Sequence, residues 1–167
     1  MTDYEKVFQE EPAACGDPYP EFVEFFRDAD RAFTILDLGS GQGRDAIQAA
    51  VCGHSVRCVE LSPTGVRQTN ERAAELGLDV RAEVGDLRTY QPSGQFDVVV
   101  LDRVVHMLKQ TEEKQALLSM AQSAVGPAGY LLLADVPSNL TLIEGFFDAG
   151  WTGVLARKGL RFYRRST

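Results

Sequence analysis

Residues 34–44 read Thr-Ile-Leu-Asp-Leu-Gly-Ser-Gly-Gln-Gly-Arg, an apolar run that passes directly into three closely spaced glycines. The run at 34–38 is typical of a strand that is buried on both faces of a parallel sheet. Gly39, Gly41 and Gly43 then predict a tight turn that opens into a helix, because glycine tolerates positive φ and leaves main-chain N–H groups accessible. A strand, a glycine turn and a helix start in this order indicate a nucleotide-binding loop, with an ordinary glycine-rich connection as the alternative.

The spacing of the glycines argues against a dinucleotide. The dinucleotide pattern G-x-G-x-x-G would place a glycine where Arg44 stands, and Asp37 inside the strand is a second departure from it. The wording Asp-Leu-Gly-Ser-Gly-Gln-Gly resembles the first motif of class I S-adenosylmethionine (SAM)-dependent methyltransferases. The resemblance implies that this loop packs against the methionine part of SAM, with Asp37, Gly39, Ser40 and Gly41 as candidate cofactor-binding residues.

Acidic residues also follow the next two expected strands, at 55–61 and 79–84. At the end of the first of these strands, Glu60, with Leu61 beside it, is placed to accept hydrogen bonds from both ribose hydroxyls. After the second, Asp86 can accept from the adenine amine while the Leu87 N–H donates to a ring nitrogen. The resemblance agrees, because class I methyltransferases often carry an acidic turn against the adenine here. The alternatives are a surface acid before a helix N-terminus and an ordinary turn pair.

The run at 96–102 predicts the central strand, and the segment after it lies at the edge of the sheet where ligands bind. Asp102 is a candidate cofactor contact and Arg103 a candidate acceptor contact. His106 is the candidate general base, because imidazole titrates near neutral pH. Alternatively, its ring only fills space or caps the turn. If the acceptor is a thiolate or another soft anion, the enzyme needs only to position it, and loss of His106 should have a small effect on turnover. The sequence favours this case.

The remaining pattern alternates helices and strands and then ends in two strands. An antiparallel hairpin after five parallel strands resembles the class I methyltransferase sheet, an α/β, Rossmann-like, doubly wound sheet of seven strands in order 3-2-1-4-5-7-6. A dinucleotide fold would usually add a parallel sixth strand. The expected elements are helices at 63–76 and from 111 to a stop at 126–127, a strand at 130–136, a short helix that begins at 141–144 and ends at 150, and hairpin strands at 152–156 and 160–164.

Residues 1–33 form a preamble with two short amphipathic helices separated by a Pro- and Gly-rich loop. The first helix either closes over the pocket as a lid or simply packs on the edge of the sheet. Tyr4 and Tyr19 are therefore candidate acceptor contacts. Arg44 at the start of the following helix either steers an anionic acceptor or faces solvent.

The chain of 167 residues predicts a single domain at 1–167 with one hydrophobic core. Its net charge of −7 argues against a nucleic-acid partner, and the five basic residues at 157–165 are interpreted as a solvated hairpin face. Three cysteines without metal-ligand spacing predict reduced thiols and no metal site. With no long apolar run and no signal-like start, we expect a cytoplasmic protein without a membrane partner. The sequence predicts no oligomeric state.

The function predicted is transfer of a methyl group from SAM to a small-molecule acceptor, with S-adenosylhomocysteine (SAH) as product. The glycine motif resembles most the small tellurite-resistance and thiopurine-type methyltransferases. The sequence lacks both the Asn-Pro-Pro-Tyr motif and the Pro-Cys dipeptide of DNA methyltransferases, and the short stretch at 136–151 leaves little room to recognise a large acceptor. The alternatives are a non-catalytic SAM or nucleotide sensor and an NAD-dependent oxidoreductase.

Overall fold

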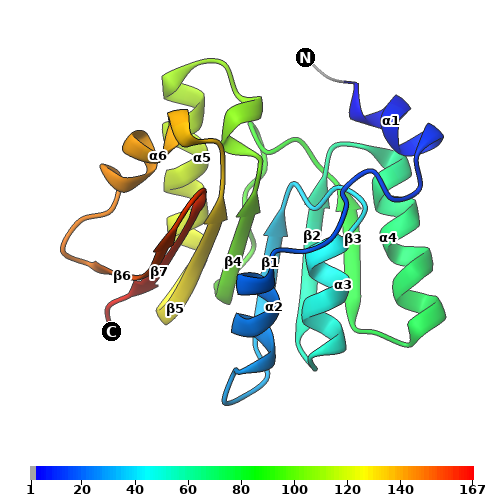
Figure 1. The fold of residues 1–167 in the computed structure, drawn as a ribbon, viewed down its shortest axis with the longest axis horizontal. Helices are drawn as coiled ribbons and strands as arrows, with labels where there is room; N and C mark the ends of the chain where they lie inside the picture. The colour runs from blue at the N-terminus through cyan, green and yellow to red at the C-terminus, as the bar shows by residue number, and fades with distance from the viewer. Residues whose placement is uncertain (1–2) are drawn as a thin grey trace. The chain divides into compact units, whose positions relative to one another are not determined.

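The computed structural model describes residues 3–167, so Met1 and Thr2 of the expected preamble lie outside it (Figure 1). Helices and strands alternate along most of the chain, as the sequence predicts. The elements are α1 (Tyr4–Glu10), α2 (Pro20–Arg27), β1 (Thr34–Leu38), α3 (Arg44–Val51), β2 (Ser55–Glu60), α4 (Pro63–Leu76), β3 (Val80–Val84), β4 (Phe96–Asp102), the 3₁₀ turn η1 (Val105–Met107), α5 (Thr111–Ala124), β5 (Val125–Ala134), α6 (Pro137–Glu144), β6 (Trp151–Arg157) and β7 (Leu160–Arg165).

The strands form one seven-stranded sheet in the order β3-β2-β1-β4-β5-β7-β6, which confirms the predicted topology. Strands β1, β2 and β3 pair in parallel, and so do β4 and β5. Strand β7 is antiparallel to both β5 and β6, so the predicted C-terminal hairpin is present. By its internal contacts the chain divides into two compact units, one ending at Leu87 and one beginning at Arg88. The single domain stays a prediction.

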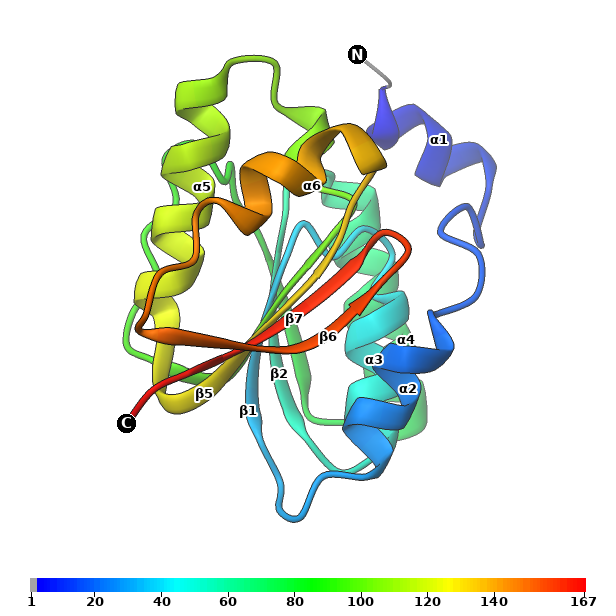
Figure 2. The same cartoon turned by 60° about the vertical axis from the view of Figure 1, so that its left-hand side comes forward.

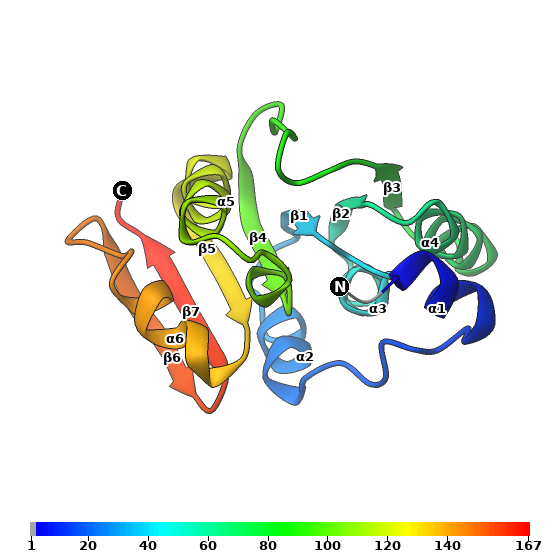
Figure 3. The same cartoon turned by 90° about the horizontal axis from the view of Figure 1, so that it is seen from above.

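The N-terminal unit is built on the buried strand β1, whose Ile35, Leu36 and Leu38 are almost fully shielded from solvent. Helices α3 and α4 lie on the same side of the three parallel strands (Figure 3). Helix α4 has the predicted bounds because its ends are capped. The Ser62 hydroxyl accepts from the Gly65 N–H at 3.0 Å, and Gly77 ends the helix at φ +66°.

The C-terminal unit has its core between β4 and β5, where residues 98–101 and 131–133 are buried. These continuous apolar runs require cover on both faces, as expected for neighbouring parallel strands. The β6–β7 hairpin lies beside β5 (Figure 2). No helix in the described part of the chain is long and apolar enough to cross a membrane.

Several predicted boundaries in this unit are wrong. Strand β5 starts at Val125 and not at Tyr130, so Gly126 and Pro127 belong to the strand. In the sequence, this Gly-Pro pair predicts the end of the preceding helix. In the structure it marks an irregular start of β5, with a register shift opposite Phe96 and a positive φ at Ala128. Helix α6 begins at Pro137, because proline at the first helical position needs no N–H acceptor, and it ends at Glu144. The capping box at 141–144 is therefore not the helix start.

Candidate functional site

The glycine turn after β1 is held by the protein's own backbone. Gly39, Gly41 and Gly43 have φ of +77°, +57° and +75°, a backbone conformation that residues with a side chain rarely adopt. The Gly39 N–H donates to the Val59 carbonyl at 2.7 Å, and the Gly43 N–H donates to the Ser40 carbonyl at 2.9 Å. The turn is thus fixed against the end of β2 and curls into the start of α3.

Two glycines near this turn serve helix packing. A Cβ on Gly43 would lie 2.5 Å from Cγ2 of Thr69 on α4, and a Cβ on Gly65 would lie 2.5 Å from the Gly41 carbonyl oxygen. Both distances are far below van der Waals contact, so α4 can approach the turn only because both positions lack side chains. Sequence reasoning missed Gly65, since an isolated glycine inside a helix gives no signal of what it approaches.

Glu60 is buried at the end of β2, with 9% of its surface exposed, and its carboxylate bridges two loops. Oε2 accepts from the Gly41 N–H and Oε1 accepts from the Ser62 N–H, both at 2.9 Å. Each carboxylate oxygen can accept more than one hydrogen bond, so these contacts leave capacity for hydroxyl donors. The structure places this acid directly against the glycine turn, where the sequence predicted a ribose-binding acid.

The other predicted cofactor residues of the N-terminal unit lie within or directly after the three parallel strands. Leu61 is 58% exposed although it is apolar, and the Gly85 N–H donates to the Glu60 carbonyl at 2.9 Å, which fixes the turn that carries Asp86 and Leu87. Strands β1, β2 and β3 are parallel, so their carboxyl ends share one edge of the sheet. This edge offers a carboxylate for ribose hydroxyls and an uncovered apolar side chain for an adenine ring, so it fits SAM.

Asp37 differs from Glu60 and Asp86 because it lies inside its strand, β1, and not at or beyond the strand's end; like Glu60, it is buried. It is paired in register with Cys58 of β2. Burial raises the pKa of the Cys58 thiol well above its usual range, and the charge of Asp37 adds to that rise, so the thiol stays neutral. No group of three or more His, Cys, Asp or Glu side chains within residues 3–167 is placed to hold a metal ion.

Helix α1 is attached to the N-terminus of α4 through Glu5. The Glu5 carboxylate accepts from the Ser62 hydroxyl at 2.5 Å, the Thr64 hydroxyl at 2.6 Å and the Thr64 N–H at 3.1 Å. These hydrogen bonds lower the pKa of Glu5 from 4.5 to about 2. Phe8 of α1 is buried beside Gly41, and Tyr4 next to it is partly exposed. Helix α1 therefore packs on α4, not on the edge of the sheet as the packed-helix alternative expected, while a lid movement stays a prediction.

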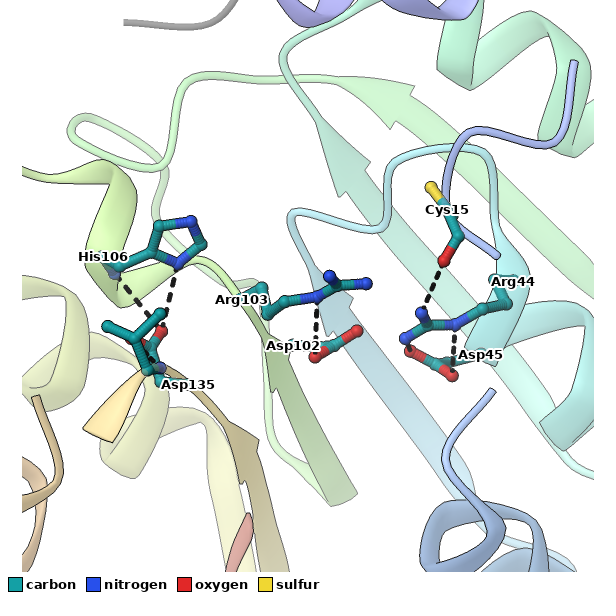
Figure 4. A network of polar contacts seen from close by, with 8 residues as sticks. Cys15, Arg44, Asp45, Asp102, Arg103, His106 and Asp135 are labelled. Atoms are coloured by element: carbon teal, nitrogen blue, oxygen red, sulfur yellow. Dashed lines mark hydrogen bonds and ion pairs between the residues drawn. The ribbon is translucent and has the colours of Figure 1, made fainter. Parts of the chain in front are cut away.

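Arg44 does not face solvent, so that alternative is wrong: only 10% of its side chain is exposed. Its Nη2 lies 2.7 Å from Oδ2 of Asp45, and its Nη1 donates to the Cys15 carbonyl at 2.8 Å (Figure 4). The Arg44 guanidinium also lies 5.6 Å from the centre of the Tyr19 ring. Its charge is already paired and its contacts tie the preamble to α3. A role in steering an anionic acceptor stays a prediction.

In the C-terminal unit, β4 ends at Asp102, and the next residue, Arg103, has an unusual backbone conformation. Arg103 has φ +53°, although it is not glycine, and its N–H donates to the Ala134 carbonyl at 2.7 Å. Its Nε lies 3.9 Å from Oδ1 of Asp102 (Figure 4). Backbone strain of this kind clusters at functional sites. The Arg103 guanidinium is half-exposed, and its contact with an acceptor stays a prediction.

His106 lies in the 3₁₀ turn η1, beside an acid that the sequence reasoning missed. Its ring Nδ1 lies 3.6 Å from Oδ2 of Asp135, and its backbone N–H donates to the same oxygen at 3.2 Å (Figure 4). Asp135 follows β5 directly, so the signal that pointed to Glu60 and Asp86, an acid after a parallel strand, could have found it.

Comparisons with known proteins agree with this arrangement. Residues 35–129 match the family model described as a methyltransferase domain. The chain is 24% identical over 131 residues to 2-heptyl-1-hydroxyquinolin-4(1H)-one methyltransferase of Mycobacteroides abscessus, covering 77% of this chain and 58% of the relative. It is 25% identical over 112 residues to the probable SAM-dependent methyltransferase TehB of Haemophilus influenzae, covering 64% of this chain and 39% of the relative.

Among solved structures, the N-methyltransferase NodS of Bradyrhizobium japonicum in complex with SAH has a TM-score of 0.77 at 13% identity, covering 98% of this chain and 99% of the other. This likeness shows a shared fold. The chain spans less than two thirds of the length of the two curated relatives named above.

Proposed function

The chain belongs to the family of SAM-dependent methyltransferases, and we propose that it transfers a methyl group from SAM to a small-molecule acceptor, leaving SAH. The observation that carries the proposal is the Glu60 carboxylate, buried at the carboxyl end of β2 and bonded to the glycine turn. A dinucleotide-binding turn would have placed glycine where the buried, ion-paired Arg44 stands. The comparisons favour neither an NAD-dependent oxidoreductase nor a non-catalytic sensor.

In this proposal the carboxyl edge of β1, β2 and β3 binds the cofactor. Glu60 accepts from the ribose hydroxyls, Leu61 covers one face of the adenine ring, and Asp86 with the Leu87 N–H takes the polar edge of that ring. The Gly39 to Gly41 turn and Asp37 face the methionine part. SAM supplies a methyl group that is already activated on a positively charged sulfur.

The acceptor is proposed to lie beside the residues that follow β4, with Arg103 and His106 as its contacts. Two observations support a small acceptor. Between β5 and β6 the chain contains only α6 and a short connection, and the preamble is attached to its own unit by α1 instead of extending as a separate binding element. The absence of a nucleic-acid partner and the cytoplasmic location stay predictions. The binding roles of Tyr4, Tyr19 and Asp102 also stay predictions.

Calorimetry with SAM, SAH and NAD tests the cofactor. We expect micromolar binding of SAM and SAH and none of NAD. Glu60→Ala should weaken SAM binding by about 1.5–3 kcal/mol, roughly 10- to 150-fold, because charged hydrogen bonds are lost. Glu71→Ala on the exposed surface of α4 is the matched control and should leave the affinity unchanged.

Glu60→Gln keeps an acceptor for the Gly41 N–H and serves as the second variant if Glu60→Ala does not fold. If both folded variants bind SAM within twofold of the wild type, the assignment of Glu60 is refuted.

The acceptor class is tested with SAM carrying a labelled methyl group. The probes are 2-heptyl-1-hydroxyquinolin-4(1H)-one as a hydroxyl, benzylamine as an amine, 2-mercaptoethanol as a thiol, and a mixed protein fraction. We expect label in at least one small molecule. Label in the protein fraction alone would show that the acceptor is a macromolecule.

A further inference from the structure

A polar chain with a buried centre at Asp135 and Asn139 runs from Lys114 of α5 to His106 of η1 within the C-terminal unit. The Lys114 Nζ donates to Oδ1 of Asn139 at 2.9 Å, and the Asn139 Nδ2 donates to Oδ1 of Asp135 at 2.7 Å. The second oxygen of Asp135 accepts from the His106 N–H at 3.2 Å. The Asp135 carboxylate thus links η1 to α6, and Asn139 of α6 continues the chain to α5.

Asp135 is fixed far more firmly than a simple turn residue requires. Its side chain is 1% exposed, and its Oδ1 also accepts from the Val136 N–H at 2.9 Å. Its backbone N–H donates to the Gly159 carbonyl at 3.0 Å, and a Cβ on Gly159 would lie 2.6 Å from the Asp135 carbonyl oxygen. Three N–H groups, from His106, Val136 and Asn139, thus hold this carboxylate in one orientation, with Oδ2 towards η1.

Oδ2 of Asp135 faces one particular nitrogen of the His106 ring. The His106 Nδ1 is buried and lies 3.6 Å from Oδ2 of Asp135, and it makes no hydrogen bond to any described residue. The His106 side chain as a whole is 29% exposed. Figure 4 shows Nε2 on the side of the ring away from Asp135. A lone pair on Nδ1 would repel the carboxylate, so the proton of the neutral ring belongs on Nδ1 and the lone pair on Nε2. Catalytic contacts of this kind are often long in free enzymes and shorten on binding.

We propose that Asp135 is a positioning residue that holds His106 in the Nδ1–H tautomer, so that Nε2 accepts the proton of a hydroxyl or amine acceptor. This inference rests on the proposed function and adds the acceptor class, in place of the thiolate or soft anion that the sequence alone favoured. The acceptor O or N forms a bond to the methyl carbon, the carbon–sulfur bond breaks with its electrons going to sulfur, and the acceptor proton goes to Nε2. Asp135 stabilises the resulting imidazolium. The other charged groups near the ends of β4 and β5 are Asp102 and Arg103, which face each other, and Lys114 behind Asn139.

The tautomer can be measured directly by long-range ¹H–¹⁵N NMR on protein labelled at its histidine nitrogens, at pH 8 and without ligand. The chain has two histidines, and His54 is an internal reference of the opposite kind. Its Nδ1 accepts from the Phe33 N–H at 3.1 Å, so its proton must lie on Nε2, which faces the Phe26 carbonyl at 2.9 Å. We expect the Nδ1–H pattern for His106 in the wild type and its loss in Asp135→Asn, with the His54 signals unchanged. A predominant Nε2–H pattern for His106 in the wild type overturns the proposal.

Turnover of the hydroxyl or amine probe provides the second measurement. His106→Ala should lower kcat about 10²- to 10⁴-fold and Asp135→Asn at least about tenfold, with the Kd of SAM within twofold of the wild type. Glu144→Gln removes a carboxylate that pairs with Arg161 in the same unit and should change neither value. A thiol as the only methylated probe, or a loss below tenfold in His106→Ala, overturns the base assignment. Absence of SAM binding in the wild type refutes the proposed function instead, and the NMR result does not depend on it.

Discussion

Gly43→Ala tests whether the third glycine of the turn is needed for packing against α4. Alanine at φ +75° costs about 1–2 kcal/mol of stability, because its Cβ crowds the following carbonyl. The new Cβ would also lie 2.5 Å from Cγ2 and 2.7 Å from Oγ1 of Thr69, which are buried and cannot move freely. Overpacking of this size adds about 1–3 kcal/mol, so we expect a total loss of about 2–5 kcal/mol.

Two further variants resolve the two contributions. Gly77→Ala is the control for backbone strain, because Gly77 has φ +66° and nothing within 4 Å of its Cβ position, so it should lose only about 1–2 kcal/mol. Thr69→Ala removes the crowded atoms, at the cost of a buried methyl group and the hydrogen bond from Oγ1 to the Gly65 carbonyl, about 1–2 kcal/mol. The double variant of Gly43 and Thr69 should therefore be about 1–3 kcal/mol more stable than the two single losses together predict.

The assay is urea unfolding at 25 °C, followed by circular dichroism, with the free energy of unfolding extrapolated to water. Gly43→Ala destabilised by less than about 0.5 kcal/mol would refute the packing argument, since surface substitutions commonly stay within that range. Additivity of the two single variants within about 0.5 kcal/mol would show that Thr69 is not what excludes a side chain at position 43.

Two other variants test how the preamble is attached. The lowered pKa of Glu5 means that its contribution is present above pH 4.5 and is lost as the pH falls towards 2, so the protection of α1 against hydrogen exchange, corrected for the intrinsic pH dependence of the exchange rate, should fall across that interval in the wild type. At pH 7, Glu5→Gln should already show fast exchange and Glu10→Gln should not, while equal protection of α1 in both would contradict the attachment. Arg44→Gln leaves the carboxylate of Asp45, 7% exposed, without its partner and should cost about 3 kcal/mol of unfolding free energy, whereas a loss below about 1 kcal/mol would show that the pair contributes little.

Features that depend on neighbouring residues could be predicted from the sequence. Strands β1 and β4 and helix α4 have the predicted bounds, because apolar runs and caps are local signals. The strand order followed from the hairpin at the C-terminus and from the resemblance. The positions of Glu60 and Asp86 also followed, since each acid lies at or just beyond the carboxyl end of a parallel strand.

Contacts between distant segments could not be predicted in the same way. Asp135 meets His106 only because the end of β5 lies beside the turn after β4, and Glu5 meets Thr64 only because α1 packs on α4. Neither pair leaves a pattern in the local sequence. Arg44 was open to two interpretations because its partner Asp45, the next residue, and the Cys15 carbonyl become decisive only when the preamble folds back.

The hydrogen bonds of the glycine turn also change how a substitution at Glu60 must be interpreted. Its carboxylate already holds the Gly41 and Ser62 N–H groups without any ligand, and the Gly39 N–H is held by the Val59 carbonyl. A turn fixed in this way loses little conformational entropy when the cofactor binds, and this preorganisation is itself a part of the affinity. Glu60→Ala therefore removes the ribose acceptor and loosens the turn at the same time. Glu60→Gln keeps one backbone contact, so the difference in SAM affinity between the two variants reports the contribution of the fixed turn.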